Sequence, residues 1–155
     1  MVNDKYTQSA NNLSKAADIA IKAVKEHPPM YWDDKTINHV VECYFEWKNN
    51  AINPEPKFKN LTSLKHVLER IFTMFQEGSG TFVEEFWKEI KAQNLPYKRE
   101  NKLAKILKRK KINNIHEYDF VIDVIVPYEQ EGLINNEEVV LLNKWIGEFE
   151  NLKKN

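Results

Sequence analysis

His39, Glu42, Cys43 and Glu46 are the side chains whose types and spacing come closest to a metal or catalytic site. The spacings of three and four place imidazole and carboxylate groups on one face of a helix, which could begin a carboxylate metal site. No Glu-x-x-His pair completes a di-iron pattern, and this face lies opposite an apolar stripe, so we expect a solvated surface. Cys43 has His39 four residues away but no third group to orient the imidazole, so we expect a packed, inert thiol.

Two glycine-containing segments, 75–86 and 127–138, resemble calcium-binding loops only superficially. An EF-hand loop needs an oxygen ligand at position 1 and a carboxylate at position 12. Position 1 is Phe75 in one segment and Pro127 in the other, and position 12 of the first is Phe86. We therefore expect two turns between helices and no metal ion.

Nucleophilic and nucleotide-dependent chemistry lack their usual sequence signals. Ser79 lies between two glycines but follows a helical pattern and lacks the G-x-S-x-G context of a nucleophile elbow. Neither of the common glycine-rich phosphate-binding motifs occurs. We expect no cofactor and no enzymatic activity, and an enzyme with an unfamiliar site is the least favoured interpretation.

Charge is balanced over the chain but unevenly distributed along it. The 155 residues include 23 basic and 23 acidic side chains, yet residues 88–111 hold ten basic against two acidic ones, a net charge of +8. Residues 112–155 compensate with a net charge of −6. A basic helix of this kind can bind phosphates or an acidic protein, or it can be a solvated lysine-rich face.

Composition indicates a cytoplasmic protein. Cys43 is the only cysteine, so no intrachain disulfide can form, and no apolar segment is long enough to suggest a signal peptide or a membrane contact. The excess of 20 Lys over 3 Arg, together with 17 Asn, is typical of AT-rich genomes and indicates a bacterial or phage source.

The elements that would position these residues are helices. With 42% hydrophobic residues and only four glycines, the sequence predicts an all-α fold, a compact single-domain bundle of six or seven helices spanning 1–155. Apolar periodicity places helices at about 7–26, 34–50, 64–77, 82–95, 98–111, 118–126 and 136–149.

Caps and core positions follow from the same patterns. Asp33 or Asp34, Thr81, and Asn135 or Asn136 are expected to cap helices. Segment 118–126 is rich in Val and Ile, so a small irregular or β element remains the alternative there. The expected core includes Leu68, Ile71, Phe72, Phe86, Ile106, Ile122, Leu142 and Trp145.

The sequence shows no convergent catalytic groups, and binding through a protein surface needs no fixed motif. Both points favour a non-catalytic protein-binding module, such as an immunity-type or phage-type inhibitor. Tyr31, Trp32 and Trp47 fit no helical stripe well and are the candidate aromatic anchors. The alternative is nucleic-acid binding through the basic segment 98–111. Its candidate contacts are Lys98, Arg99, Lys102, Lys105, Lys108 and Arg109.

Overall fold

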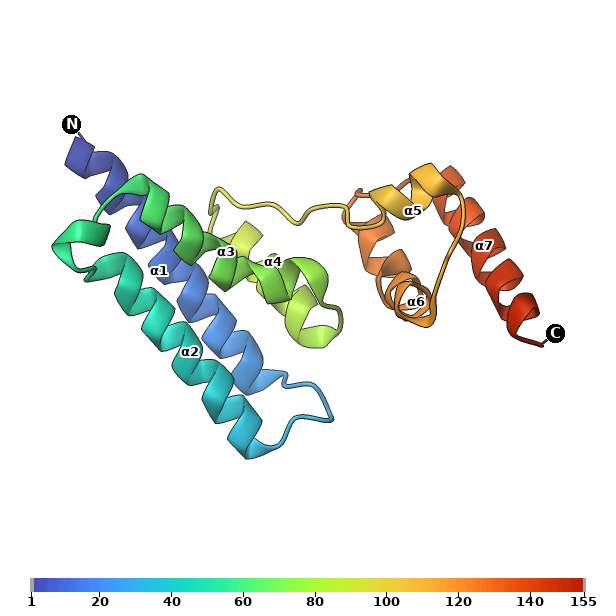
Figure 1. Cartoon of the computed structure of the whole chain (residues 1–155), viewed down its shortest axis with the longest axis horizontal. Helices are drawn as coiled ribbons and strands as arrows, with labels where there is room; N and C mark the ends of the chain where they lie inside the picture. Colours follow the sequence, from blue (N-terminus) through green and yellow to red (C-terminus); the bar gives the residue numbers. More distant parts are fainter. Residues whose placement is uncertain (1, 155) are drawn as a thin grey trace. The chain divides into compact units, whose positions relative to one another are not determined.

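A computed structural model describes residues 2–154 of the chain, and the side chains of residues 5–153. Within this range the structure has seven α-helices, one short 3-10 helix and no strand, so the expected all-α fold class is confirmed (Figure 1). The helices are α1 (Val2–Glu26), α2 (Asp34–Ile52), η1 (Pro56–Phe58), α3 (Leu61–Glu77), α4 (Thr81–Ala92), α5 (Ala104–Arg109), α6 (Ile115–Gln130) and α7 (Asn136–Lys154).

These helices form two compact units, one up to Lys98 and one from Arg99 onward. Each unit has its own hydrophobic core. That the whole chain is a single domain stays a prediction.

Helix α1 organises the N-terminal unit by packing against α2, α3 and α4. Its buried face is built from small side chains, with Ala16, Ala17 and Ala20 wholly inaccessible to solvent. Because alanine adds so little bulk, the neighbouring helices can approach this face closely. Leu13 and Val24 are also buried, and Tyr6 extends the buried face toward the start of α1.

Aromatic side chains fill the rest of this core. Phe75 stacks on Phe86 with ring centroids 3.8 Å apart, and Trp87 Nε1 donates to the Phe75 carbonyl at 2.8 Å. The Tyr44 hydroxyl donates to the Ile71 carbonyl at 2.9 Å and thereby ties α2 to α3. The polar atoms of the Tyr44 and Trp87 side chains are thus paired, as a low-dielectric interior requires.

The C-terminal unit packs α6 against α7, with residues from the α5 region completing its core. Val121, Val124 and Tyr128, at spacings of three and four, form the buried face of α6. Ile122 lies outside this face and is 45% exposed, so its assignment to the core was wrong. The same periodicity shows why 118–126 is helical and not a β element.

Of the three helix caps expected from the sequence, two are confirmed by the structure. Asp33 accepts from Thr36 N at 2.8 Å, and Asn135 forms a reciprocal capping box with Glu138, with bonds of 2.8 and 3.0 Å. The third expectation was wrong, because Gly80 and not Thr81 precedes α4. Gly80 has φ +108°, a conformation that side-chain-bearing residues rarely adopt, and it lets the chain reverse within three residues of α3.

The expected helix over 98–111 is reduced to the six residues of α5. Asn101 explains the shortening, because its side chain accepts from Leu103 N at 2.9 Å and donates to the Leu133 carbonyl at 3.1 Å. These bonds hold residues 99–103 outside a helix and fix the start of α5.

No helix in the described part of the chain combines the length and the apolar character needed to cross a membrane.

Candidate functional site

The connection between α1 and α2 exposes two large hydrophobic side chains at its tip. Met30 is fully exposed and Tyr31 is 86% exposed, the highest fractions among the large hydrophobic residues described. Trp32 N donates to the Pro29 carbonyl at 3.0 Å, which closes a turn with Met30 and Tyr31 at its two central positions. Pro28 and Pro29 restrict the backbone just before this turn.

Trp32 anchors the turn to the N-terminal core. Its ring is partly buried and lies 5.7 Å from the Phe82 ring of α4. The Tyr31 ring meets Trp32 edge-on at 6.5 Å with an interplanar angle of 89°. The apolar side chains at the tip are therefore presented to solvent by a supported backbone, an arrangement that lowers the entropy cost of binding.

The three aromatic residues nominated from the sequence thus occupy different environments. Tyr31 is an exposed surface residue, whereas Trp32 supports the turn from within. Trp47 packs edge-on against Tyr44 at 4.9 Å and belongs to the edge of the core. Met30 was missed because a lone methionine carries no periodic signal, although its place after Pro28-Pro29 could have marked a turn.

Acidic residues border the turn on its α2 side. Asp33 and Asp34 are both exposed. The hydrogen bonds that Asp33 accepts from Thr36 hold the pKa of that carboxyl below its usual range. Two carboxylates therefore border the turn on this side, and the exposed Lys35 follows them.

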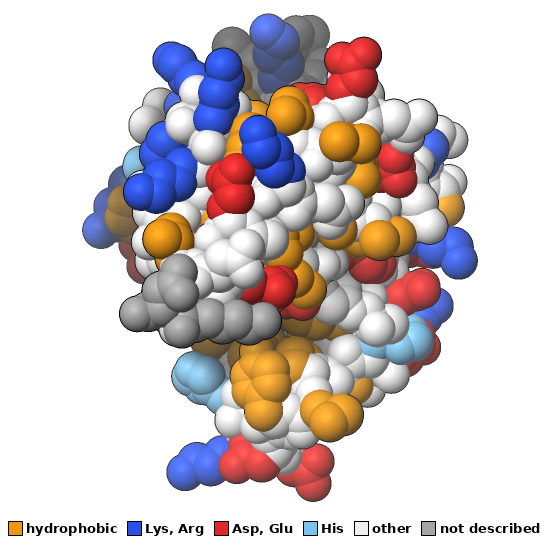
Figure 2. Space-filling view, turned by 90° about the vertical axis from the view of Figure 1, so that its right-hand side faces the viewer, with side chains coloured by type: hydrophobic (Ala, Val, Ile, Leu, Met, Phe, Trp, Pro, Cys, Tyr) orange, Lys and Arg blue, Asp and Glu red, His pale blue; other side chains and the backbone are white. Residues whose placement is uncertain are grey.

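The candidate basic residues lie in both units of the chain. Lys98 is exposed and belongs to the N-terminal unit, where its carbonyl accepts from the Gln76 side chain at 2.9 Å. Lys102 is exposed and pairs with Glu100 at 3.0 Å, while Lys105 and Lys108 are exposed on α5. Figure 2 shows Lys and Arg side chains close together on one part of the viewed face.

The two candidate arginines hold the C-terminal unit together. Arg99 is 7% exposed, lies 4.9 Å from the Tyr128 ring centroid and approaches Glu131 at 3.5 Å. Arg109 pairs with Glu117, both of whose carboxylate oxygens accept from Nη2, at 2.6 and 2.8 Å. Arg99 is therefore unavailable as a surface contact, and the charge of Arg109 is largely compensated.

The polar face of α2 does not gather into a metal site. Cys43 Sγ lies 3.8 Å from His39 Nε2, and Glu42 and Glu46 are exposed. Among the residues with described side chains, no group of three or more His, Cys, Asp or Glu could hold a metal ion.

In comparisons with known proteins, no family model, no curated protein and no solved structure matches this chain.

Proposed function

We propose that the chain is a cytoplasmic, non-catalytic protein-binding module whose contact surface is centred on the turn Pro29–Trp32. The observation that supports this proposal is the pairing of two solvent-exposed apolar side chains with a backbone fixed by Trp32. Tyrosine is common at binding hot spots, and methionine adapts its shape to an apolar pocket. An inhibitor of the immunity or phage type would use such a surface without catalysis.

The charges near the turn favour a protein over a lipid surface. Asp33 and Asp34 follow it directly, and acidic groups are repelled by the anionic lipids that attract peripheral proteins. A protein partner with an apolar pocket and basic residues around it complements both features of this surface.

Nucleic-acid binding through the basic segment remains the second candidate. Lys105, Lys108, Lys110 and Lys111 are exposed and carry no ion pair within the described side chains. Against this candidate, Arg99 and Arg109 are engaged within their own unit, so the bidentate contacts that arginine gives to phosphates are lost.

Photo-crosslinking tests the proposal. Tyr31→p-benzoylphenylalanine places a reactive group at the tip of the turn, and the irradiated lysate of the source cells is examined with and without nuclease. Val140, which is 69% exposed on α7, provides the matched control position. We expect a discrete protein adduct from position 31 that is absent from position 140 and unaffected by nuclease.

Either of two results would contradict the proposal. The same set of adducts from both positions would mean that the turn has no specific partner. Loss of the adduct after nuclease treatment would favour the nucleic-acid candidate instead.

A further inference from the structure

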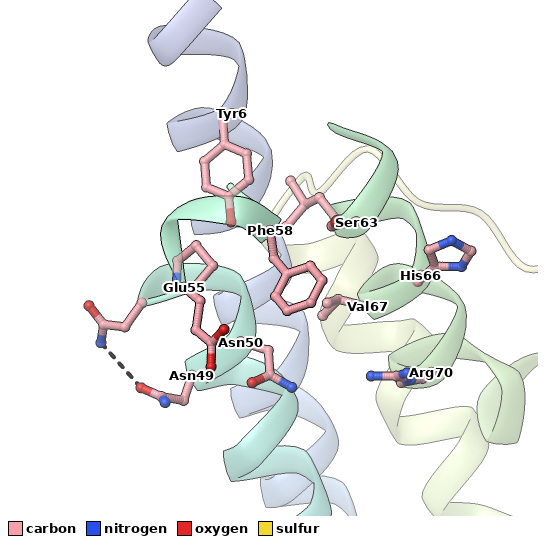
Figure 3. Close-up of a pocket in the computed structure, with 12 residues that line it drawn as sticks. Tyr6, Asn49, Asn50, Glu55, Phe58, Ser63, His66, Val67 and Arg70 are labelled. Carbon is pink, nitrogen blue, oxygen red and sulfur yellow. Dashed lines mark hydrogen bonds between the residues drawn. The ribbon is translucent and has the colours of Figure 1, made fainter. Parts of the chain in front are cut away.

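A groove of about 540 Å³ opens on the N-terminal unit between the end of α2, η1 and the first half of α3 (Figure 3). This volume lies in the range of small-molecule sites. It is separate from the turn, because the two lie at opposite ends of α2, about 25 Å apart at the helical rise of 1.5 Å per residue. Its lining comprises Tyr6, Asn49, Asn50, Asn53, Pro54, Glu55, Phe58, Ser63, Leu64, His66, Val67 and Arg70.

One face of α3 supplies the cationic side of the groove. Ser63, His66, Val67 and Arg70 recur at spacings of three and four, so their side chains lie along one helical stripe. Arg70 is exposed and makes no hydrogen bond or ion pair with any described residue. His66 Nδ1 lies 4.0 Å from a Glu69 carboxylate oxygen. Arg70 is the lining side chain whose positive charge does not depend on pH in the ordinary range.

The end of α2 supplies amide groups on the other side. Asn53 Nδ2 donates to Asn49 Oδ1 at 3.2 Å, which occupies part of both side chains. The Asn50 side chain is half-buried and forms no hydrogen bond within the described part of the chain. A side-chain amide presents a donor and an acceptor together, the pair that matches the edge of a nucleobase.

Phe58 places an aromatic ring between these two sides. Figure 3 shows the ring directed into the groove, with Asn50 and Arg70 on either side of it. The ring is half exposed, and Lys57 Nζ lies 5.0 Å from its centroid. Lys57 also approaches Glu55 at 3.6 Å, which compensates the one carboxylate of the lining.

We propose that this groove binds a nucleotide. The heterocycle packs against Phe58 and hydrogen-bonds through its edge to Asn50, while the phosphate pairs with Arg70. Ring packing, a matched amide and a cation each recognise a different part of the same ligand. A free nucleoside monophosphate and one residue of a single-stranded nucleic acid share this chemistry, so the experiment must separate these two sources.

Binding is measured on the full chain by ¹H–¹⁵N NMR titration with AMP, adenosine and a twelve-residue oligo(dA). We expect AMP to shift the NMR signal of the Asn50 side-chain amide. The affinity for AMP should fall by about tenfold in Arg70→Gln, as loss of a charge-assisted hydrogen bond predicts. Adenosine lacks the phosphate, so its affinity should be the same for both proteins. Lys65→Gln, an exposed α3 residue outside the lining, is the control and should leave AMP binding unchanged.

The oligonucleotide distinguishes the sources. Tighter binding of oligo(dA) than of AMP, with the same Arg70 dependence, identifies a single strand as the ligand, and the reverse order identifies a free nucleotide. No shift at Asn50 with any of the three probes at millimolar concentration would overturn the proposal. An equal loss of adenosine and AMP binding in Arg70→Gln would do so as well.

Discussion

Glu117 links the end of α5 to the start of α6 through one carboxylate. It accepts from Arg109 Nη2 at both oxygens and from Asn113 N at 2.8 Å. The hydrogen bond from Arg109 is the main reason that the pKa of Glu117 lies below its usual value. A carboxyl whose pKa is lower in the folded chain adds stability above its unfolded pKa and loses it as the pH falls through the folded pKa.

The variant Glu117→Gln tests this contact. We expect it to lower the free energy of unfolding by about 1 kcal/mol at neutral pH, because the ion pair is only partly shielded from solvent. The difference from the wild type should shrink as the pH falls through the folded pKa of Glu117, which lies below its usual value, because both proteins then carry a neutral side chain. Urea unfolding at a series of pH values measures this difference in the free energy of unfolding. Glu129→Gln, on the exposed side of α6, is the control. An equally large difference at acidic and neutral pH would refute the assignment.

The burial and the partners of individual side chains were harder to predict from the sequence than the helices. Tyr31 could be nominated because it fits no helical stripe, but Arg99 looked like a surface cation and is buried against Tyr128. By sequence Arg109 likewise fits a phosphate-binding face, but in the structure it pairs with Glu117. Net charge along a segment does not say which charges are compensated, since that depends on residues distant in sequence.

At the scale of elements, the close packing of α1 rests on its alanines. Ala17 is wholly buried where α1 meets its neighbours, so any added bulk must displace packed side chains. We expect Ala17→Leu to lower the free energy of unfolding by about 1–3 kcal/mol, the usual cost of overpacking. Lys15→Leu introduces the same side chain at an exposed position of α1 and should have little effect. Equal unfolding midpoints for the two variants in urea would show that α1 is not closely packed.

Helix periodicity predicted elements well where an apolar stripe and a polar cap coincided. Asn135 and the acidic residues after it marked the start of α7 correctly. The apolar stripe of Leu103, Ile106 and Leu107 predicted too long a helix at 98–111, because apolar periodicity does not account for the Asn101 bonds that hold the chain outside a helix. The groove beside Phe58 was not predictable at all, since it joins residues from α2, η1 and α3 with no shared sequence motif.

At the scale of the whole molecule, charge separates along the chain but is partly neutralised by folding. The basic residues around α5 meet the acidic residues of α6 within the C-terminal unit, as the Arg109–Glu117 pair shows. Hydrophobic side chains are spread among polar ones over the upper part of the face seen in Figure 2, and large ones lie closer together toward its lower end. In the turn at Met30 and Tyr31 the two apolar side chains are adjacent in sequence, and Trp32 packs beneath them against Phe82 of the core.

The dissociation constant for the protein captured through position 31 tests the central claim most directly. It is to be measured for the wild type, for Met30→Ser with Tyr31→Ser, and for a control carrying Val140→Ser with Leu152→Ser, two exposed α7 positions. We predict that the turn variant binds at least about tenfold more weakly, mainly through faster dissociation, as loss of hot-spot side chains implies. The control should bind like the wild type. Unchanged affinity in the turn variant, with its fold intact by circular dichroism, would contradict the account.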